Sequence, residues 1–208
     1  SQGVSEVKSQ LRSIIKPAII LFVICLVVAA SLALTHAITK DKIAERAAID
    51  AENARREVLA DADSFSRVEN IEEYINENQE LDIVKEVYKG VKNNTSVGYV
   101  FLVVTKGYGG DMEVTVGINN KGEITGVKIG NNSETPGLGR KVTEDAFTSQ
   151  FSGFAPSEPL QVVKRKKAKK EEIEAISSAT ISSRAVTKAV QAAVDMASQL
   201  LEEGGKAE

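Results

Sequence analysis

Residues 17–39 contain no Asp, Glu, Lys or Arg, and this stretch constrains the fold more than any other feature of the chain. It begins at Pro17, is almost wholly apolar from Ala18 to Leu34 and closes with Thr35-His36-Ala37-Ile38-Thr39. About 20 apolar residues at about 1.5 Å each cross the ~30 Å hydrocarbon core of a bilayer. A signal peptide has a shorter apolar core, whereas this one continues past Ala29-Ala30-Ser31. We therefore expect an uncleaved single-pass transmembrane helix rather than a signal peptide or a buried soluble helix.

The two flanks of this span carry equal positive charge. Three basic residues lie on each side of it: Lys8, Arg12 and Lys16 before, and Lys40, Lys42 and Arg46 after. The positive-inside rule assigns the more basic flank to the cytoplasm, so an even balance gives no orientation. A short tail ahead of a large downstream domain fits an N-terminus in the cytoplasm. We expect residues 1–16 to form a cytoplasmic tail and residues 17–39 to form the transmembrane helix.

The chain has a single cysteine, Cys25, and a single histidine, His36. One cysteine cannot form an intrachain disulfide, and its place in the middle of the span predicts an apolar packing role. His36 lies near the end of the span, where an interfacial side chain is a simpler interpretation than a ligand. These two residues supply neither a His/Cys metal cluster nor a Ser-His-Asp triad. We expect no bound metal and no catalytic residue.

One run of cations, Lys164-Arg165-Lys166-Lys167-Ala168-Lys169-Lys170, would suit nucleic acid if it stood alone. However, the formal net charge is -3, aromatic residues make up 5% of the chain, and the chain carries an apolar span. The acidic run Glu171-Glu172-Ile173-Glu174 follows directly and partly neutralises the cations. We interpret the basic run as a solvated loop, with contact to a flavin phosphate or to anionic lipid as alternatives, and expect no nucleic-acid partner.

Beyond the span, residues 40–80 are predicted to form a helical linker that leads into a soluble domain. One helix is expected to end near residue 62 and a second to run from about Val68 to Asn78. Strand signals begin near Leu81. Val84, Val87 and Tyr88 precede a polar break at Lys92-Asn93-Asn94-Thr95. Three runs separated by short Gly/Asn turns then predict an antiparallel meander at Val97–Thr105, Met112–Ile118 and Glu123–Ile129, with one more strand at Leu160–Lys164. This order predicts an α+β domain at residues 81–208, an antiparallel sheet with flanking helices around one core.

The segment Ser177-Ser178-Ala179-Thr180-Ile181-Ser182-Ser183 places five hydroxyl side chains in seven residues. Apolar residues at i, i+4 spacing follow it and predict an amphipathic helix from about Ser183 to Glu203. Ser182 or Ser183 is the expected N-cap. Unpaired N–H groups and the helix dipole favour an anion at such a start, and small side chains let a phosphate approach the backbone. Helix capping alone also explains any one of these hydroxyls.

A second distinctive segment, Glu134-Thr135-Pro136-Gly137-Leu138-Gly139, lies between the meander and the next predicted helix. Pro136 fixes the φ angle, the two glycines permit close backbone approach, and Leu138 is held between them. This arrangement suits a planar ring that lies on Leu138 with backbone N–H groups near its polar edge. An ordinary Pro-Gly turn is the alternative.

The segment Glu174-Ala175-Ile176-Ser177-Ser178-Ala179-Thr180 resembles the flavinylation motif Asp-x-x-(Ser/Thr)-Gly-Ala-Thr of the FMN-binding domains of the Rnf and Na⁺-NQR respiratory complexes. In that family, the last Thr of the motif carries FMN through a phosphoester bond. Two positions depart from the pattern: Glu174 replaces Asp and keeps its charge, whereas Ser178 replaces Gly and adds a hydroxymethyl group. The segment Glu134–Gly139 resembles the family's second motif, which contacts the isoalloxazine ring, and Phe147–Phe151 resembles the segment that follows it.

Two motifs in the expected order behind one N-terminal span extend the resemblance over essentially the whole chain. The chain most resembles the G subunits of the Rnf complex, with the C subunit of Na⁺-NQR as the runner-up. The resemblance implies that Thr180 is the attachment site of covalent FMN and not a catalytic nucleophile. It also implies that residues of both motifs bind the cofactor: Ser177, Ser178, Ala179, Ser182, Ser183, Glu134, Thr135, Gly137, Leu138 and Gly139.

The resemblance further implies an electron carrier in a membrane complex that moves electrons between ferredoxin and NAD, coupled to Na⁺ or H⁺ translocation. The expected partners are the other membrane, iron–sulfur and flavin subunits, the lipid bilayer of a bacterial cytoplasmic membrane, and a separate flavin transferase. Residues 40–208 would lie outside the cytoplasm. Two other functions stay open: a stand-alone anchored flavin module for extracellular electron transfer or sensing, and a structural anchor that is unflavinylated because Ser178 replaces Gly.

Overall fold

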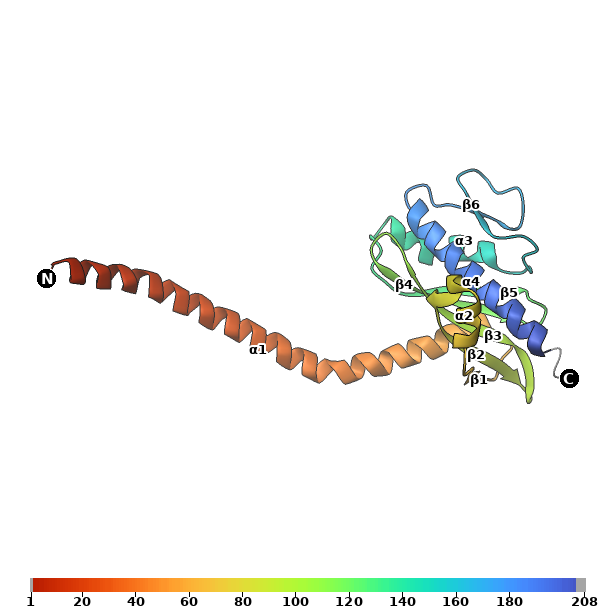
Figure 1. The fold of residues 1–208 in the computed structure, drawn as a ribbon, viewed down its shortest axis with the longest axis horizontal. Coiled ribbons are helices and arrows are strands. Elements are labelled where there is room, and N and C mark those ends of the chain that lie inside the picture. The colour runs from red at the N-terminus through yellow and green to blue at the C-terminus, as the bar shows by residue number, and fades with distance from the viewer. Residues whose placement is uncertain (1, 205–208) are drawn as a thin grey trace. The chain divides into compact units, whose positions relative to one another are not determined.

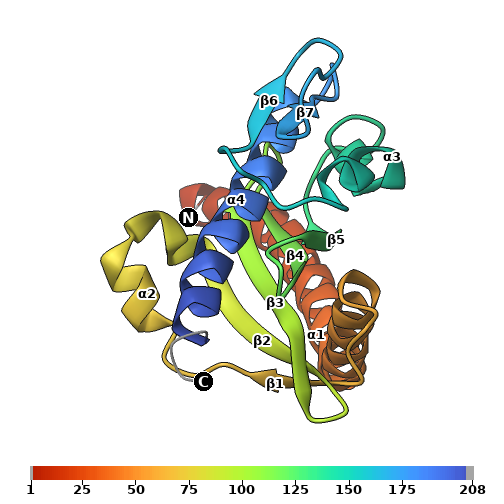
Figure 2. The same ribbon diagram turned by 90° about the vertical axis from the view of Figure 1, so that its right-hand side faces the viewer.

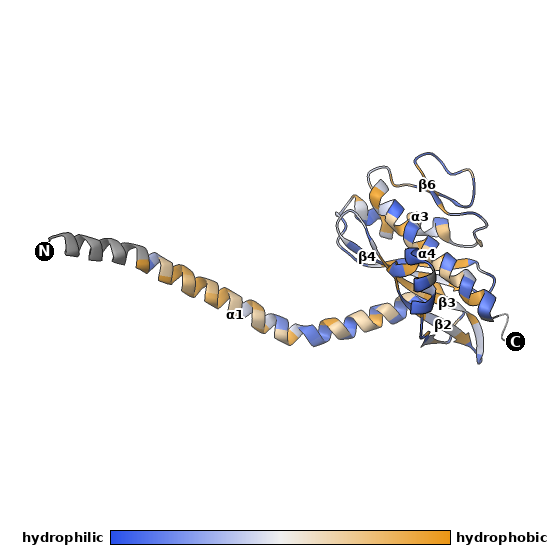
Figure 3. Ribbon diagram, viewed as in Figure 1, coloured by the Kyte–Doolittle hydropathy of each residue, from blue (hydrophilic) through white to orange (hydrophobic). Residues whose placement is uncertain are grey.

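The structure is a computed structural model that describes residues 2–204, and the order of its elements can be followed in Figure 1. The chain divides into two compact units, Ser1–Asp50 and Ala51–Glu208. Helix α1 (Gln2–Val58) supplies the described part of the first unit and the first residues of the second. Figure 3 shows a band of apolar residues along this helix.

Within the described residues, α1 contains the one helical stretch long and apolar enough to cross a membrane. The side chains from Ile15 to Ala51 are all exposed. Hydroxyl groups inside the apolar band donate to carbonyl oxygens one turn earlier, Ser31 to Val27 at 2.8 Å and Thr35 to Ser31 at 2.9 Å. These bonds satisfy polar groups without a partner from elsewhere, which keeps the band compatible with lipid.

The second unit begins with the last turns of α1. Val58, Leu59 and Ala62 are buried in a small cluster with Val100 of the sheet. The helix ends at Val58 and not near residue 62 as expected, because Leu59 and Ala62 turn inward to pack against the sheet. Burial of Leu59 and Ala62 against the sheet competes here with the helix propensity of the sequence.

Five antiparallel strands form one sheet in the order β1-β2-β3-β4-β5, so each strand pairs with its neighbours in sequence. They are β1 (Ser64–Arg67), β2 (Val84–Lys92), β3 (Thr95–Lys106), β4 (Asp111–Asn119) and β5 (Ile124–Asn132). The predicted three-stranded meander is confirmed in β3 to β5, and the strand signals at Val84, Val87 and Tyr88 lie in β2. The predicted strand onset near Leu81 is wrong, because β1 comes earlier; its sequence Ser-Phe-Ser-Arg lacks an alternating apolar pattern. Helix α2 (Glu72–Glu77) and the 3₁₀ helix η1 (Gln79–Ile83) lie between β1 and β2.

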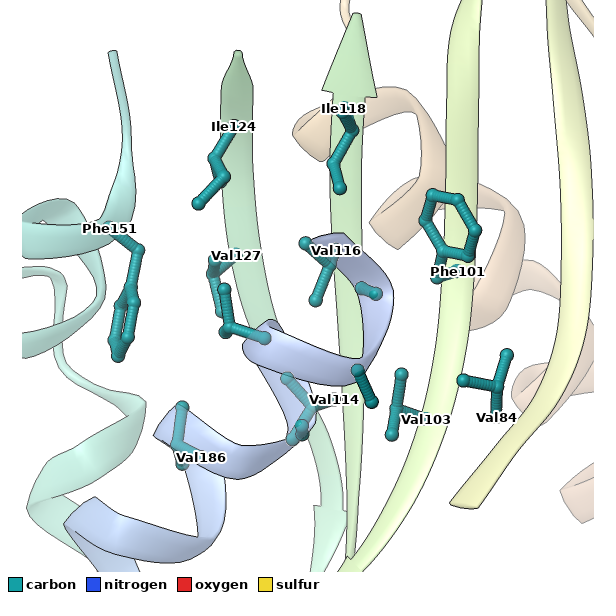
Figure 4. Packing of buried hydrophobic residues seen from close by; sticks show 14 of the residues in the cluster. Val84, Phe101, Val103, Val114, Val116, Ile118, Ile124, Val127, Phe151 and Val186 are labelled. Carbon is teal, nitrogen blue, oxygen red and sulfur yellow. The ribbon is translucent and has the colours of Figure 1, made fainter. Parts of the chain in front are cut away.

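Helix α4 (Thr180–Gly204) crosses one face of this sheet, as Figure 2 shows. Its apolar stripe, including Val186, packs on inward side chains of the strands such as Val103, Val114 and Val116 (Figure 4). Much of the stripe is alanine, and small side chains allow a helix to approach a sheet closely. The predicted α+β class with one main core is confirmed.

Between β5 and α4 the chain forms short elements. These are η2 (Gly139–Thr143), α3 (Asp145–Thr148), η3 (Ser149–Phe151), β6 (Gln161–Val163) and β7 (Glu172–Glu174). The strand expected at Leu160–Lys164 is present as β6, but it pairs in parallel with β7 in a separate two-stranded sheet. Phe147 and Phe151 meet edge to face with ring centroids 5.6 Å apart, so this pair serves the core.

Candidate functional site

One cavity of about 390 Å³ brings together the two motifs that the sequence singled out. Its walls come from the β3–β4 loop, the segment after β5 and the start of α4, and its lining residues are Tyr108, Glu134, Thr135, Leu138, Gly139, Ser177, Ser178, Ala179, Thr180, Ile181 and Ser182. The predicted site residues therefore all line one cavity except Gly137 and Ser183. Its volume lies in the range of small-molecule pockets, about 300–1,000 Å³.

The cavity has an unusual apolar wall. Tyr108, Leu138 and Ile181 are 71%, 48% and 54% exposed, and all three line this cavity. No other large hydrophobic side chain is exposed in the described part of residues 51–208. Apolar groups left together in water at one place on a folded domain mark a surface that a ligand or partner covers.

A buried carboxylate holds the walls together. Glu134 is 5% exposed, and its two oxygens accept hydrogen bonds from different segments. Oε1 accepts from the backbone N–H of Gly109 at 3.1 Å, and Oε2 accepts from the hydroxyl of Ser182 at 2.6 Å. Because Gly109 lies in the β3–β4 loop and Ser182 in the first turn of α4, Glu134 joins all three segments of the cavity. Glu134 therefore connects the three walls of the cavity through hydrogen bonds.

Two glycines make room for this carboxylate. A Cβ atom on Gly107 would lie 2.0 Å from Oε1 of Glu134, and one on Gly139 would lie 2.1 Å from Oε2. Such distances are too short for any side chain, so both positions require glycine while Glu134 stays in place. Of the two loop glycines expected to permit close approach, Gly139 does so and makes room for Glu134, whereas a Cβ on Gly137 would meet nothing within 4 Å.

The start of α4 differs from the expected one. The helix begins at Thr180, so the prediction that Ser182 or Ser183 is the N-cap is wrong. Ser183 donates to the carbonyl oxygen of Ala179 at 2.9 Å and accepts from the N–H of Ile176 at 3.2 Å, while Ser182 donates to Glu134. Both hydroxyls are buried, Ser182 in a bond to a segment distant in sequence and Ser183 in bonds to nearby backbone. Among the described residues, no protein group accepts a hydrogen bond from the N–H of Thr180, Ile181 or Ser182.

The hydroxyls before the helix lie differently. Ser177 and Ser178 are exposed, Ala179 is buried and Thr180 is half-buried at the cavity. Ser178 does not adopt the left-handed backbone region, because the described non-glycine residues with positive φ are Asn70, Asn93 and Asn94. The position that departs from the motif's Gly is therefore compatible with an ordinary side chain.

Sequence reasoning missed two of the three apolar wall residues, Tyr108 and Ile181. Each had a local signal. Tyr108 is an aromatic residue inside the loop Gly107-Tyr108-Gly109-Gly110, and Ile181 is an apolar residue among hydroxyls, off the buried stripe of α4. Neither signal identifies a ligand site until the fold places both residues beside Leu138.

Two family models match the chain. One, described as the RnfG N-terminal region, matches residues 8–58, and the other, the FMN-binding domain, matches residues 107–195. The second match spans the β3–β4 loop, the segment after β5 and the start of α4, and so includes every wall of the cavity. A crystal structure of Shewanella oneidensis NqrC aligns with a TM-score of 0.49 at 21% identity, covering 74% of each chain.

Two relatives match nearly end to end. The G subunit of the Na⁺-translocating ferredoxin:NAD⁺ oxidoreductase complex of Acetobacterium woodii is 37% identical over 197 residues, which cover 92% of this chain and 95% of the relative. The G subunit of the proton-translocating ferredoxin:NAD⁺ oxidoreductase complex of Clostridium ljungdahlii is 32% identical over 186 residues, 89% of this chain and 91% of the relative. This chain therefore belongs to the family of Rnf-type G subunits, which carry an FMN-binding domain.

Proposed function

We propose that this chain is a membrane-anchored flavin subunit that relays electrons within an ion-translocating ferredoxin:NAD oxidoreductase complex. In this proposal FMN is joined to the hydroxyl of Thr180 by a phosphoester bond. The observation that carries the proposal is the exposed apolar wall of Tyr108, Leu138 and Ile181, which lies in the same cavity as Thr180. A flat aromatic ring attached at Thr180 would cover that wall.

The start of α4 suits the phosphate. The N–H groups of Thr180, Ile181 and Ser182 have no protein acceptor among the described residues, and they lie at the positive end of a helix of 25 residues. Orphan N–H groups and the helix dipole together favour a phosphate at this position. Because the hydroxyls of Ser182 and Ser183 are already hydrogen-bonded to Glu134 and to nearby backbone, neither hydroxyl competes for these donors.

The walls suit the ring. FMN, when bound, supplies one-electron redox chemistry, and the chain supplies position and environment. Leu138 and Ile181 would pack on the ring and exclude water from that side, and Tyr108 would cover a further part of it. Glu134 would keep the Leu138 loop and the start of α4 at a constant separation through its two hydrogen bonds. The remaining motif residues that line the cavity are Thr135, Gly139, Ser177, Ser178 and Ala179.

The backbone conformation of Ser178 argues against the alternative that the chain is a structural anchor without a flavin. That alternative requires Ser178 to spoil a motif that needs glycine. However, Ser178 is exposed, and its φ angle does not lie in the left-handed region that favours glycine. Its hydroxymethyl group therefore causes no backbone strain at this position. We propose that a flavin transferase modifies this variant of the motif as it does the Gly form.

Mass spectrometry tests the attachment. The intact protein from its native membrane should carry the mass of one FMN, mapped by peptides to Thr180, and Thr180→Ala should lose it. Ser177→Ala is the matched control, because it removes an exposed hydroxyl three residues earlier and should keep the flavin. Flavin that stays covalently bound to Thr180→Ala, or that is lost only from Ser177→Ala, would reject the assignment.

The membrane part of the proposal rests on α1. We propose that residues 1–16 are a cytoplasmic tail and residues 17–39 cross the bacterial cytoplasmic membrane. Residues 40–80 would lead into the FMN-binding domain at 81–208 outside the cytoplasm. The exposed apolar band of α1 supports the span. Protease added to intact spheroplasts should digest the domain; full protection until lysis would place the domain inside and reverse the proposed electron route.

The other members of the complex are the proposed partners. A flavin outside the cytoplasm cannot take electrons directly from a soluble cytoplasmic donor, so partner subunits would have to carry them through the bilayer. The end-to-end match to two G subunits supports this membership. Co-purification with multi-span subunits from native membranes is the expected result, whereas a fully flavinylated chain that purifies alone would favour the stand-alone module.

A further inference from the structure

A second hollow lies directly beside the cofactor cavity. It has a volume of about 680 Å³ and lies between the first turns of α4 and the sheet end where β2 begins, β3 ends and β4 begins. Ile181 lines both hollows, so they share a wall. We call this second hollow the basic groove, because four cations line it: Lys85, Lys106, Arg184 and Lys188.

These four cations are free of ion pairs. None of them lies within 4.0 Å of a carboxylate among the described residues, although Asp82 and Asp111 also line the groove. Lys85 donates only to the backbone carbonyl of Asp82, at 2.6 Å. Of the fifteen other cations in the described part of residues 51–208, nine likewise have no carboxylate partner, and six have one: Arg55, Arg56, Arg67, Lys128, Arg165 and Lys169.

The groove is basic in spite of the surrounding composition. Residues 51–208 hold 20 Lys and Arg against 25 Asp and Glu, so a random patch of their surface would be acidic. Arg184 and Lys188 follow Ile181 at spacings of three and seven, which places all three on one face of α4. They are the only cations in that helix, and both are exposed next to the cofactor cavity.

We propose that the basic groove docks an acidic protein segment of the redox partner that exchanges electrons with the flavin. The inference rests on the proposed function for the position of the flavin. Half-buried Ile83 and Val104 and exposed Ile181 also line the groove. A segment with acidic and apolar side chains would match both the charge and the apolar walls, whereas a small free anion would match only the charge.

Docking at this place would have a direct consequence for electron transfer. A segment seated in the groove touches Ile181, which also forms the wall of the cofactor cavity. The partner's redox centre, a flavin or an iron–sulfur cluster, would give one electron to the flavin or take one from it, with no other reactant consumed. Unpaired charges beside the site would steer the partner's acidic surface and fix its orientation.

Photo-cross-linking in the native complex tests the docking. A photoreactive amino acid at position 188 should cross-link to another subunit of the complex, at a segment that mass spectrometry shows to be acidic. The matched control is position 121, in the β4–β5 turn at the opposite end of the sheet, which should not label that segment. Cross-links to a neutral or basic segment, to the flavin transferase or to lipid alone, or no cross-link at all, would overturn the proposal.

Charge reversal supplies the second arm. In full-length protein in its membrane, Arg184→Glu with Lys188→Glu should slow flavin reduction by the complex about tenfold or more at low ionic strength. Lys92→Glu with Lys121→Glu makes the same change of charge at the far end of the sheet and should have little effect. Reversing the acidic residues of the cross-linked segment to Lys should restore the rate. If the flavin of the Arg184→Glu, Lys188→Glu variant is reduced at the wild-type rate, the proposal is overturned. It is also overturned if charge reversal in the partner segment does not restore the rate of that variant.

Flavin content measured on the same samples separates the two proposals. Protein that cross-links at position 188 to the acidic segment but carries no flavin would reject the proposed function and keep the docking surface. Protein that carries flavin on Thr180 but shows no such cross-link would keep the function and reject the docking surface. If phosphate or citrate at millimolar concentration abolishes the cross-link while monovalent salt of equal ionic strength does not, the groove is a small-anion site and the protein-docking proposal fails.

Discussion

The two ends of α4 bury different kinds of side chain, apolar ones in the C-terminal half and polar ones at the N-terminal end. In the C-terminal half, Met196 and Leu200 are buried and Glu203 is exposed, as in an ordinary amphipathic helix. At the N-terminal end, the hydroxyl of Ser182 is buried and the apolar side chain of Ile181 is exposed. The C-terminal half thus stabilises the fold by apolar burial, whereas the N-terminal end uses buried polar bonds to set a shape and leaves apolar surface for a ligand.

Met196→Ala should have the largest effect on stability. Met196 is fully buried in the main core, and truncation of such a side chain costs about 2–5 kcal/mol of unfolding free energy. Met196→Leu conserves volume and should cost less than about 1.5 kcal/mol. Denaturant unfolding followed by circular dichroism measures both. The folded fraction should keep its flavin. A change of flavin content at unchanged stability would contradict the purely structural role of the C-terminal half of α4.

Glu134→Ala should have the second-largest effect on stability, and it should also change the geometry of the cofactor cavity. It leaves the Ser182 hydroxyl and the Gly109 N–H without their acceptor, at a cost of about 2–4 kcal/mol. Glu134→Gln can still accept from Gly109 and donate to Ser182, so it should cost less than half as much. The same unfolding experiment, combined with flavin content, checks this. If Gln is as costly as Ala, the negative charge matters more than the two hydrogen bonds.

Tyr74→Phe should have a small, pH-dependent effect at the other end of α4. The Tyr74 hydroxyl donates to Glu203, and this hydrogen bond raises the pKa of Tyr74 from 10.0 to about 12. Because the folded-state pKa is the higher one, the stabilisation is complete below pH 10 and is lost as the pH rises through about 12. Tyr74→Phe should lower the unfolding free energy by about 0.5 kcal/mol at neutral pH, typical of an exposed hydrogen bond. A difference from wild type that persists above pH 12 would contradict this account.

Leu138→Ala should leave stability almost unchanged and alter only the flavin. Because Leu138 is 48% exposed, the unfolding free energy should shift by less than about 0.5 kcal/mol. Flavin should stay attached but become more mobile, which lowers its fluorescence anisotropy. Leu138→Met keeps an apolar contact and should preserve the anisotropy. Unchanged anisotropy in Leu138→Ala would mean that the loop is only a turn and that the wall has another occupant.

Features that depend on neighbours along the chain could be predicted from the sequence. The long apolar helix follows from an uncharged run, and the strands β2 to β5 and the stripe of α4 follow from local periodicity; the structure contains all of these elements. The two motif segments were likewise visible as runs of unusual composition. Each of these signals lies within a few residues, where backbone geometry alone sets which side chains share a face.

The assembly of the site depends instead on contacts between distant segments, which the sequence did not predict. Ser182 was expected to cap its own helix, but its hydroxyl bonds to Glu134, which is distant in sequence. Tyr108 and Ile181 come together with Leu138 only in the folded chain, where Glu134 bonds to the segments that carry them. Strand β1 and the parallel pairing of β6 with β7 also depend on partners elsewhere in the chain. Local propensity is worth a few tenths of a kcal/mol per residue, whereas a buried carboxylate without its partners costs several times more, so long-range pairing overrides it.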